Sequence, residues 1–363
     1  MEQTSVSIGV ANMLYNCAEA LAGQRILIAY EPPEFGFFDA DVVTCVAQEA
    51  TKLGFIVDLM NVGFESWSPK FSDELLDRMD GADVVVFLAR IGDQLRFSGM
   101  LRDMVIVNSY TLNKTMLGSP FASAHYGAFL ELKSAVDRLI AEAEEILITC
   151  PKGTFITGRP NLYHVPACDT TLRRFPLSVF SPVPASGFSG RVALAGFLTG
   201  TGSHYYEDYT VEFEGATIAV LKDGRLVGFE GAASDVAKAN AQYDRVSALF
   251  GIDRNFVHSW HAGIHPGCGF TGDAAENYEA WGGAAFGNPR VLHFHTCGAY
   301  APGEISWNTL DPTIWIDGVA YWKAGCFQAE LLPEGREILE RYPCAGRTFA
   351  NPDRSIGIGR LWS

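Results

Sequence analysis

The sequence predicts an α/β protein in which an N-terminal parallel-sheet domain precedes a larger α+β domain. Two observations support this prediction. Over the first 150 residues, short apolar runs alternate with amphipathic segments of helical period, and this alternation is typical of a parallel sheet covered by helices. After residue 150 the apolar runs are short and separated by turn residues, which favours antiparallel hairpins.

The elements expected in the N-terminal part follow one another as strand and helix. The first strand, RILIAY at residues 25–30, continues into EPPEFGFF, so the glycine fingerprint of a dinucleotide-binding turn is absent. A Rossmann dehydrogenase is therefore disfavoured. Further strands are expected at residues 55–60, 83–88, 104–108 and 145–149, and helices at residues 6–21, 39–53, 72–79 and 125–144.

A change in residue composition predicts a domain boundary at residue 150. Pro and Gly crowd residues 151–190, and such clusters interrupt regular structure. The predicted domains are therefore residues 1–150 and residues 151–363, and the second should carry the cleft. Its expected strands lie at residues 191–198, 211–213, 217–221, 226–229, 256–260, 290–295, 313–316 and 319–323, with a helix at residues 232–250.

Charge and cysteine usage exclude several classes of function. The chain has 27 Lys and Arg against 42 Asp and Glu, a net charge of −15, so it has no electrostatic reason to bind nucleic acid or an anionic membrane surface. Its eight Cys show no C-x-x-C spacing. Neither a signal peptide nor a membrane-length apolar run is recognisable. We expect a cytoplasmic protein with reduced thiols.

Histidines mark the candidate site. Five of the eight lie within the segments VHSWHAGIHPGCGF and RVLHFHTCG, namely His258, His261, His265, His293 and His295. Imidazole is a common ligand of Zn and Fe, and residues two apart on a strand point to the same side.

Two interpretations of this cluster remain open. The histidines could form a metal site together with a carboxylate, for which Glu304 is the best candidate. They could instead line a polar, aromatic pocket with Trp307, Tyr205 and Tyr206, where they would only donate and accept hydrogen bonds.

Several segments give the chain a remote resemblance to a known fold. They are GQRILIAY, EILITCPKGTFITGRP, VEFEGATIAVLKDGRLVGFEG, SWHAGIHPGCG, VLHFHTCG and EISWNTLDPTIWIDGVAYWKAG. In this order they resemble aminopeptidase T-type metallo-aminopeptidases and the related iron-dependent 2,5-dihydroxypyridine dioxygenases. The resemblance implies an H-x-D pair of metal ligands ahead of TIWIDG. Glu304-Ile305-Ser306 stands there instead, or Ser306-Trp307-Asn308 in a shifted register, so this pair is absent.

The resemblance and the missing pair together give a first functional expectation. It is a catalytically degenerate, metal-free member of the fold that has no cofactor and binds a peptide or small aromatic ligand. Such a protein could present its ligand to a partner biosynthetic enzyme, and the resemblance implies a homodimer. The alternative is an Fe- or Zn-dependent enzyme with altered ligands, either a ring-cleaving dioxygenase or an aminopeptidase. Its site would use His261, His293, His295 and Glu304.

Overall fold

The computed structural model describes residues 5–96, 104–160, 172–200, 204–298 and 303–359. The chain forms two compact units, of which unit 1 comprises Met1–Leu130, Asp169–Ser178 and Leu339–Pro352. Unit 2 comprises Glu131–Cys168, Val179–Ile338 and Asp353–Ser363. Each unit is therefore assembled from three separate segments of the chain, whereas the sequence pattern divides the chain once, at residue 150.

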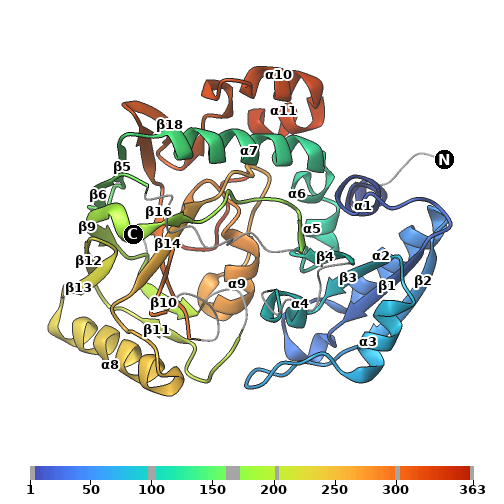
Figure 1. Ribbon diagram of the computed structural model, residues 1–363, viewed down its shortest axis with the longest axis horizontal. Coiled ribbons are helices and arrows are strands. Elements are labelled where there is room, and N and C mark those ends of the chain that lie inside the picture. Colours follow the sequence, from blue (N-terminus) through green and yellow to red (C-terminus); the bar gives the residue numbers. More distant parts are fainter. Residues whose placement is uncertain (1–4, 97–103, 161–171, 201–203, 299–302, 360–363) are drawn as a thin grey trace. The chain divides into compact units, whose positions relative to one another are not determined.

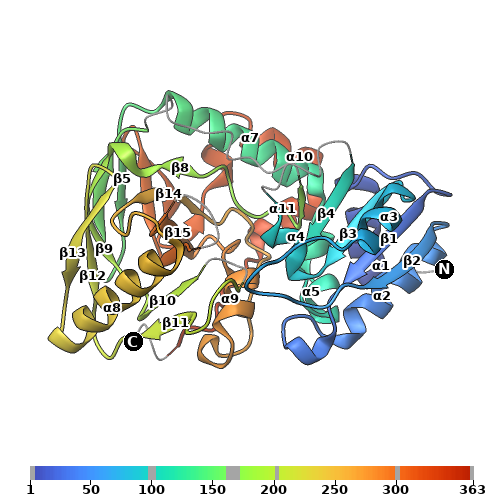
Figure 2. The same cartoon turned by 60° about the horizontal axis from the view of Figure 1, so that its bottom comes forward.

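Unit 1 contains the parallel sheet that the sequence predicts. Its strand order is β2-β1-β3-β4-β7, and every neighbouring pair is parallel. Helices lie on both faces (Figure 2), because α3 (Asp73–Asp80) packs on one face while α2 (Ala40–Lys52) contacts β1 and β2. The strands are β1 (Arg25–Tyr30), β2 (Ile56–Asn61), β3 (Val84–Leu88), β4 (Val105–Ser109) and β7 (Arg173–Phe175).

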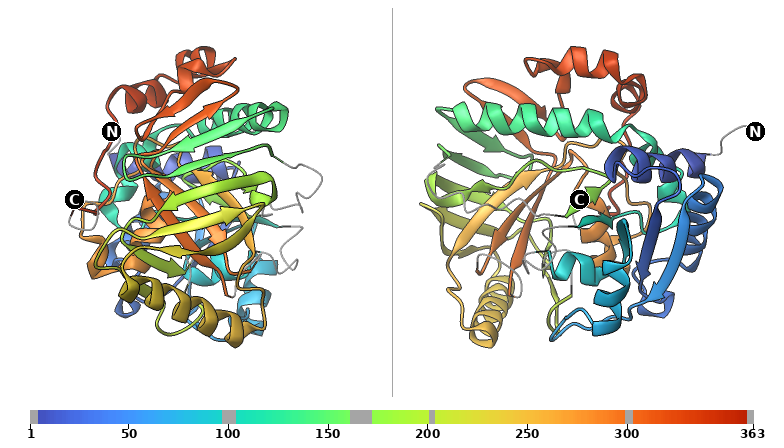
Figure 3. Two further views of the ribbon diagram at one scale, coloured as in Figure 1. Left: turned by 90° about the vertical axis from the view of Figure 1, so that its left-hand side faces the viewer. Right: turned by 45° about the vertical axis from the view of Figure 1, so that its right-hand side comes forward.

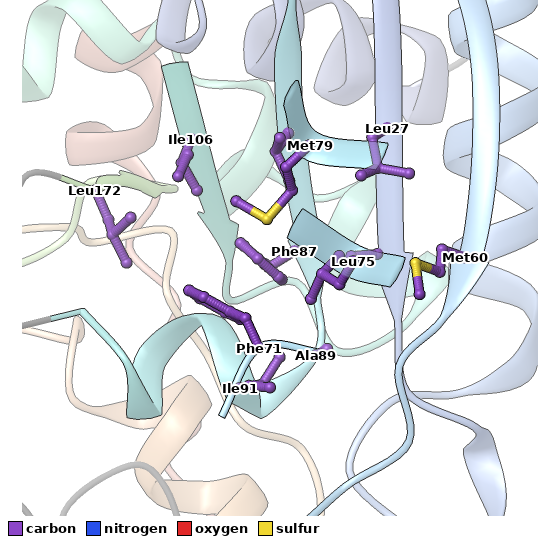
Figure 4. Packing of buried hydrophobic residues seen from close by; sticks show 12 residues of the cluster. Leu27, Met60, Phe71, Leu75, Met79, Phe87, Ala89, Ile91, Ile106 and Leu172 are labelled. Atoms are coloured by element: carbon purple, nitrogen blue, oxygen red, sulfur yellow. The ribbon is translucent and has the colours of Figure 1, made fainter. Parts of the chain in front are cut away.

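Alternation along the strands explains the core of unit 1. Leu27 of β1 and Phe87 of β3 point to the face of the sheet that α3 covers, and they pack in one buried cluster with Leu75 and Met79 of that helix (Figure 4). Helix α3 begins after Ser72, whose side chain accepts a hydrogen bond from the backbone N–H of Leu75. This N-cap satisfies a backbone donor that the first helical turn leaves without a partner.

Unit 2 contains two antiparallel sheets (Figures 1 and 3). The six-stranded sheet has the order β11-β10-β16-β15-β14-β8, and the eight-stranded sheet has the order β13-β12-β9-β6-β5-β17-β18-β19. The first comprises β8 (Val183–Pro184), β10 (Phe197–Gly200), β11 (Thr210–Glu212), β14 (Val257–Ala262), β15 (Val291–Thr296) and β16 (Ile305–Leu310). The second comprises β5 (Ile146–Thr149), β6 (Phe155–Gly158), β9 (Phe188–Ala193), β12 (Ile218–Lys222), β13 (Arg225–Glu230), β17 (Thr313–Ile316), β18 (Val319–Lys323) and β19 (Cys326–Phe327).

Two strand predictions need correction. The strand at the end of the N-terminal alternation, β5, joins the eight-stranded sheet and pairs antiparallel with β6. A short hairpin pairs neighbouring segments directly, whereas parallel pairing needs a longer crossover. The single strand expected at residues 191–198 is two strands, β9 and β10, in different sheets. Gly196, with φ of +92°, lies between them and permits the turn.

The six-stranded sheet has one apolar and one polar face. Trp260, Phe294 and Trp307 are fully buried, and Trp260 packs edge-to-face on Phe188 of the eight-stranded sheet. The two sheets thus enclose an apolar core. Because side chains alternate along each strand, the residues between these aromatics point to the opposite face.

Helices complete both units, and none of those in the described part of the chain is long and apolar enough to cross a membrane. The α-helices are α1 (Ser5–Ala11), α2 (Ala40–Lys52), α3 (Asp73–Asp80), α4 (Arg90–Gln94), α5 (Lys114–Leu117), α6 (Pro120–Ser123), α7 (Tyr126–Glu142), α8 (Ala233–Phe250), α9 (Tyr278–Ala285), α10 (Gly335–Arg341) and α11 (Pro343–Ala350). A π-helix, Asn12–Cys17, continues α1.

A buried ion pair joins the ends of two central strands of unit 1. Glu31 follows β1 and Arg90 follows β3, and their side chains, 0% and 4% exposed, pair at 2.9 Å. We expect Glu31→Gln to lower the free energy of unfolding by about 3–5 kcal/mol, because it leaves a buried guanidinium without its counter-charge. Urea denaturation measures this change.

The matched control is Glu49→Gln, which breaks a pair with Lys52, a lysine whose side chain is 68% exposed. That substitution should change the free energy of unfolding by no more than about 1 kcal/mol. Equal effects of the two substitutions would show that burial does not set the strength of the Glu31–Arg90 pair.

Candidate metal centre

Strand register brings three histidines together on the polar face of the six-stranded sheet. His261 of β14 lies directly opposite His293 of β15. His295, two residues along β15, points to the same face as His293. Paired residues of neighbouring antiparallel strands have adjacent side chains, so the three imidazoles converge although 34 residues separate the first from the last.

The three imidazoles form a compact cluster. One ring nitrogen from each lies within 4.8 Å of the others, a geometry that could hold a metal ion. The rings of His261 and His293 are 4.0 Å apart between centroids, and those of His261 and His295 are 5.1 Å apart. His261 and His293 are each 3% exposed, so the cluster lies in a largely dry environment.

Acceptors behind the rings fix the tautomers of two histidines. The Nδ1 atom of His261 is 3.0 Å from the carbonyl oxygen of Phe180, and that of His295 is 2.8 Å from Oε1 of Glu304. These oxygens can only accept from an imidazole, so Nδ1 donates in both rings. The Nε2 atoms of the neutral rings then carry lone pairs and are available as ligands.

The Nε2 atoms of His261 and His295 face each other at 3.1 Å. Two nitrogens that each bind one ion at about 2.0–2.1 Å cannot be more than ~4.2 Å apart, so this separation suits two ligands of a single metal. Without an ion, two lone pairs would oppose each other unless one ring takes up a proton. The residues present therefore fit a transition metal bound by imidazole nitrogen.

The surroundings of the cluster restrict the motion of the rings. Phe286, which follows α9, stacks on His293 with centroids 4.1 Å apart, and Trp281 of α9 packs edge-to-face on Phe286. Uncharged polar side chains extend the same face beyond the cluster, because Ser306 and Asn308 of β16 pair with His295 and His293. Both of these residues are fully buried.

The structure separates the nine side chains that the sequence nominates for the site. His261, His293, His295 and Glu304 lie together. His258 lies nearby, and burial together with the neighbouring His295 lowers its pKa despite the opposing charge of Glu304. The hydroxyl of Tyr206 donates to the backbone oxygen of Glu304 at 3.2 Å, and burial strongly raises its pKa.

The remaining three nominated residues have other surroundings. Trp307 points to the apolar face, where its Nε1 donates to the hydroxyl of Tyr243. His265 follows β14, and its Nδ1 accepts from the backbone N–H of Gly267, which stabilises the turn. Tyr205 is 5% exposed and precedes β11.

Four groups that surround the histidine cluster were not identified from the sequence. They are the carbonyl of Phe180, the ring of Phe286, Ser306 and Asn308. A signal existed for two of them, because Ser306 and Asn308 are polar residues that alternate with apolar ones in a strand that is otherwise core. A backbone carbonyl carries no such signal.

Comparisons with known proteins agree with this fold. No family model and no curated protein matches the sequence. Among solved structures, the chain is similar to 2,5-dihydroxypyridine dioxygenase from Pseudomonas putida KT2440, with a TM-score of 0.58, 12% identity, and coverage of 92% of this chain and 98% of that one. It is also similar to wild-type AmpT from Thermus thermophilus, with a TM-score of 0.48, 11% identity, and coverage of 89% and 99%. The predicted resemblance to the 2,5-dihydroxypyridine dioxygenases is confirmed at the level of the fold.

The Glu304 carboxylate should strengthen metal binding through His295. Because it holds the Nδ1 proton, it orients the ring and raises the basicity of Nε2. We expect Glu304→Ala to weaken Zn²⁺ affinity by about 10- to 100-fold, and Glu304→Gln, which keeps an acceptor without the charge, by about tenfold. Competition titration with a chromophoric chelator measures both dissociation constants.

The matched control is Glu279→Ala. Glu279 makes a similar contact with a histidine outside the cluster, since its Oε2 is 3.4 Å from Nδ1 of His204. Its loss should leave Zn²⁺ affinity within about twofold of the wild type, because His204 is not among the three clustered histidines. Equal affinity of the Glu304 variants and wild type would remove Glu304 from the support of the site.

Proposed function

We propose that the protein is a mononuclear, metal-dependent oxygenase that cleaves a small oxygenated aromatic ring. The observation that carries this proposal is the three-imidazole cluster of His261, His293 and His295. Two of its rings already have their Nδ1 protons engaged, so Nε2 is presented toward the common centre. A site in which three protein ligands leave further positions open is typical of catalytic rather than structural metal sites.

Two lines of support favour iron and oxygen chemistry over hydrolysis. Non-haem iron oxygenases bind their metal through three side chains on one side and keep the other positions open. The described chain resembles a 2,5-dihydroxypyridine dioxygenase over nearly its whole length. A hydrolase would need a general base beside the metal, and the nearby carboxylate, Glu304, is occupied with the Nδ1 proton of His295.

The residues of the chain would divide the work as follows. His261, His293 and His295 would hold the ion, and bound Fe(II) with open positions would supply activation of oxygen and of the ring. Glu304 would keep His295 in the Nδ1-protonated tautomer and partly balance the charge of a site whose three ligands are neutral. Phe286 would exclude water from the side of His293, which strengthens electrostatic interactions in the site.

The competing proposal is a metal-free binding protein for a peptide or small aromatic ligand. The observation in its favour is that no carboxylate belongs to the three-residue cluster, so every ligand atom of the cluster is an imidazole nitrogen. The two proposals differ in one measurable quantity, the metal that the purified protein retains.

The first test is metal analysis of protein purified without chelators or a nickel column. We expect about one equivalent of iron, or its uptake after anaerobic reconstitution, since a buried three-imidazole site retains divalent metals. Ala substitutions at His261, His293 or His295 should each abolish stoichiometric binding, because the loss of one of three ligands leaves two. His258→Ala, on the same strand as His261, should leave the stoichiometry unchanged.

The second readout is oxygen uptake by the iron-loaded protein with 2,5-dihydroxypyridine and with catechol. Oxygen consumption coupled to loss of the aromatic absorbance would support the oxygenase. Release of amino acids from small peptides by the zinc-loaded protein would favour the aminopeptidase alternative. A protein that takes up no metal but binds an aromatic or peptide ligand would support the binding protein and contradict the oxygenase.

A further inference from the structure

Asn308 is a buried amide next to the histidine cluster. It lies directly opposite His293 in the pairing of β15 with β16, so its side chain shares the polar face with the three imidazoles. Its exposed fraction is 0%. Its backbone is satisfied independently, since its carbonyl oxygen accepts from the N–H of Ala195 at 2.8 Å.

The two ends of this amide differ in their hydrogen bonding. Oδ1 lies 3.4 Å from the hydroxyl of Ser306, which donates to it. With the amide oriented in this way, Nδ2 points away from Ser306. Within the described residues Nδ2 has no hydrogen-bond partner. A buried donor without an acceptor destabilises the folded protein.

The neighbouring Thr309 shows how a structural polar side chain on this strand obtains a hydrogen-bond partner. Thr309 is equally buried and points to the opposite face, where its hydroxyl donates to the carbonyl oxygen of Ala193 at 2.7 Å. On the side of His293, the strand neighbour of Asn308, the rings of Phe197, Trp281 and Phe286 form a continuous chain of contacts that ends on His293. These rings offer no acceptor to Nδ2.

We propose that Asn308 binds and orients the substrate by donating a hydrogen bond from Nδ2 to a substrate oxygen held beside the three-histidine cluster. This inference rests on the proposed function and adds the chemistry of recognition to it. An amide is an uncharged donor, so it suits a hydroxyl, phenolate or carbonyl oxygen on a ring. A free carboxylate is recognised more strongly by the bidentate geometry of arginine.

The substrate class that follows is a small planar ring with an oxygen substituent close to the metal. A ring without that oxygen would leave Nδ2 unpaired and would lose the corresponding binding energy. Discrimination of this kind is strong when a buried polar group of the site depends on the substrate for its partner.

The experiment compares wild type, Asn308→Leu and Thr309→Val in three measurements. These are the melting temperature of the metal-free protein, iron content after anaerobic reconstitution, and dissociation constants for 2,5-dihydroxypyridine and pyridine without oxygen. Leu approximates the shape of Asn, but it removes both the Nδ2 donor and the acceptor for the Ser306 hydroxyl. Because the Ser306 contact is long, at 3.4 Å, the removal of the unpaired buried donor should dominate the change in stability. We expect Asn308→Leu to raise the melting temperature by about 2 °C, retain one iron and weaken 2,5-dihydroxypyridine binding by about tenfold.

Binding of pyridine should change less than about twofold in Asn308→Leu. The control Thr309→Val should lower the melting temperature, because it removes a satisfied buried hydrogen bond, and should leave both dissociation constants unchanged.

Three outcomes overturn the inference. They are a lower melting temperature of Asn308→Leu, unchanged 2,5-dihydroxypyridine binding in that variant, and a wild type that does not prefer 2,5-dihydroxypyridine to pyridine. Iron content separates this failure from failure of the proposed function. A wild type that takes up one iron but shows any of these outcomes loses only the role of Asn308, whereas a wild type without iron uptake contradicts the oxygenase itself.

Discussion

The antiparallel register of β14, β15 and β16 is the constraint on which the candidate site depends. It sets His261 opposite His293, and His293 opposite Asn308. A slip of one residue would turn every side chain of a strand to the other face. The tryptophan at position 260 would then leave the core between the two sheets, where it packs on Phe188. The same apolar packing that stabilises unit 2 therefore fixes the geometry of the histidines.

Contacts behind the rings orient the clustered histidines as metal ligands. The carbonyl of Phe180 and the carboxylate of Glu304 each engage an Nδ1 proton, and the stacked ring of Phe286 restricts His293. Imidazole rings without such partners could rotate and exchange tautomers. Preorganisation of this kind lowers the conformational cost of binding, because the ligands are already oriented before an ion arrives.

Two features of the polar face lower the stability of the folded protein. Most buried polar groups near the site have partners, such as Thr309 with Ala193, whereas Nδ2 of Asn308 lacks one among the described residues. The approach of the Nε2 atoms of His261 and His295 to 3.1 Å is a second local cost in the absence of an ion or proton. Both costs fall on the same face of three neighbouring strands, β14, β15 and β16. Buried polar groups that lack favourable hydrogen bonds are typical of functional sites.

Much of the fold could be predicted from the sequence, because it rests on local patterns. The helix–strand alternation before residue 150 predicted the parallel sheet, and five histidines within 38 residues marked the candidate site. The sequence also singled out Glu304 as the nearby carboxylate. These features depend on periodicity and residue type, which are local properties of the chain.

Only the tertiary structure decided which of these residues act together. It placed β5 in the antiparallel sheet and turned Trp307 into the core. It also joined His261 to His293 and His295, and it supplied the carbonyl of Phe180. Strand register and long-range pairing determine these contacts, and no short stretch of sequence encodes which distant strand will lie beside it.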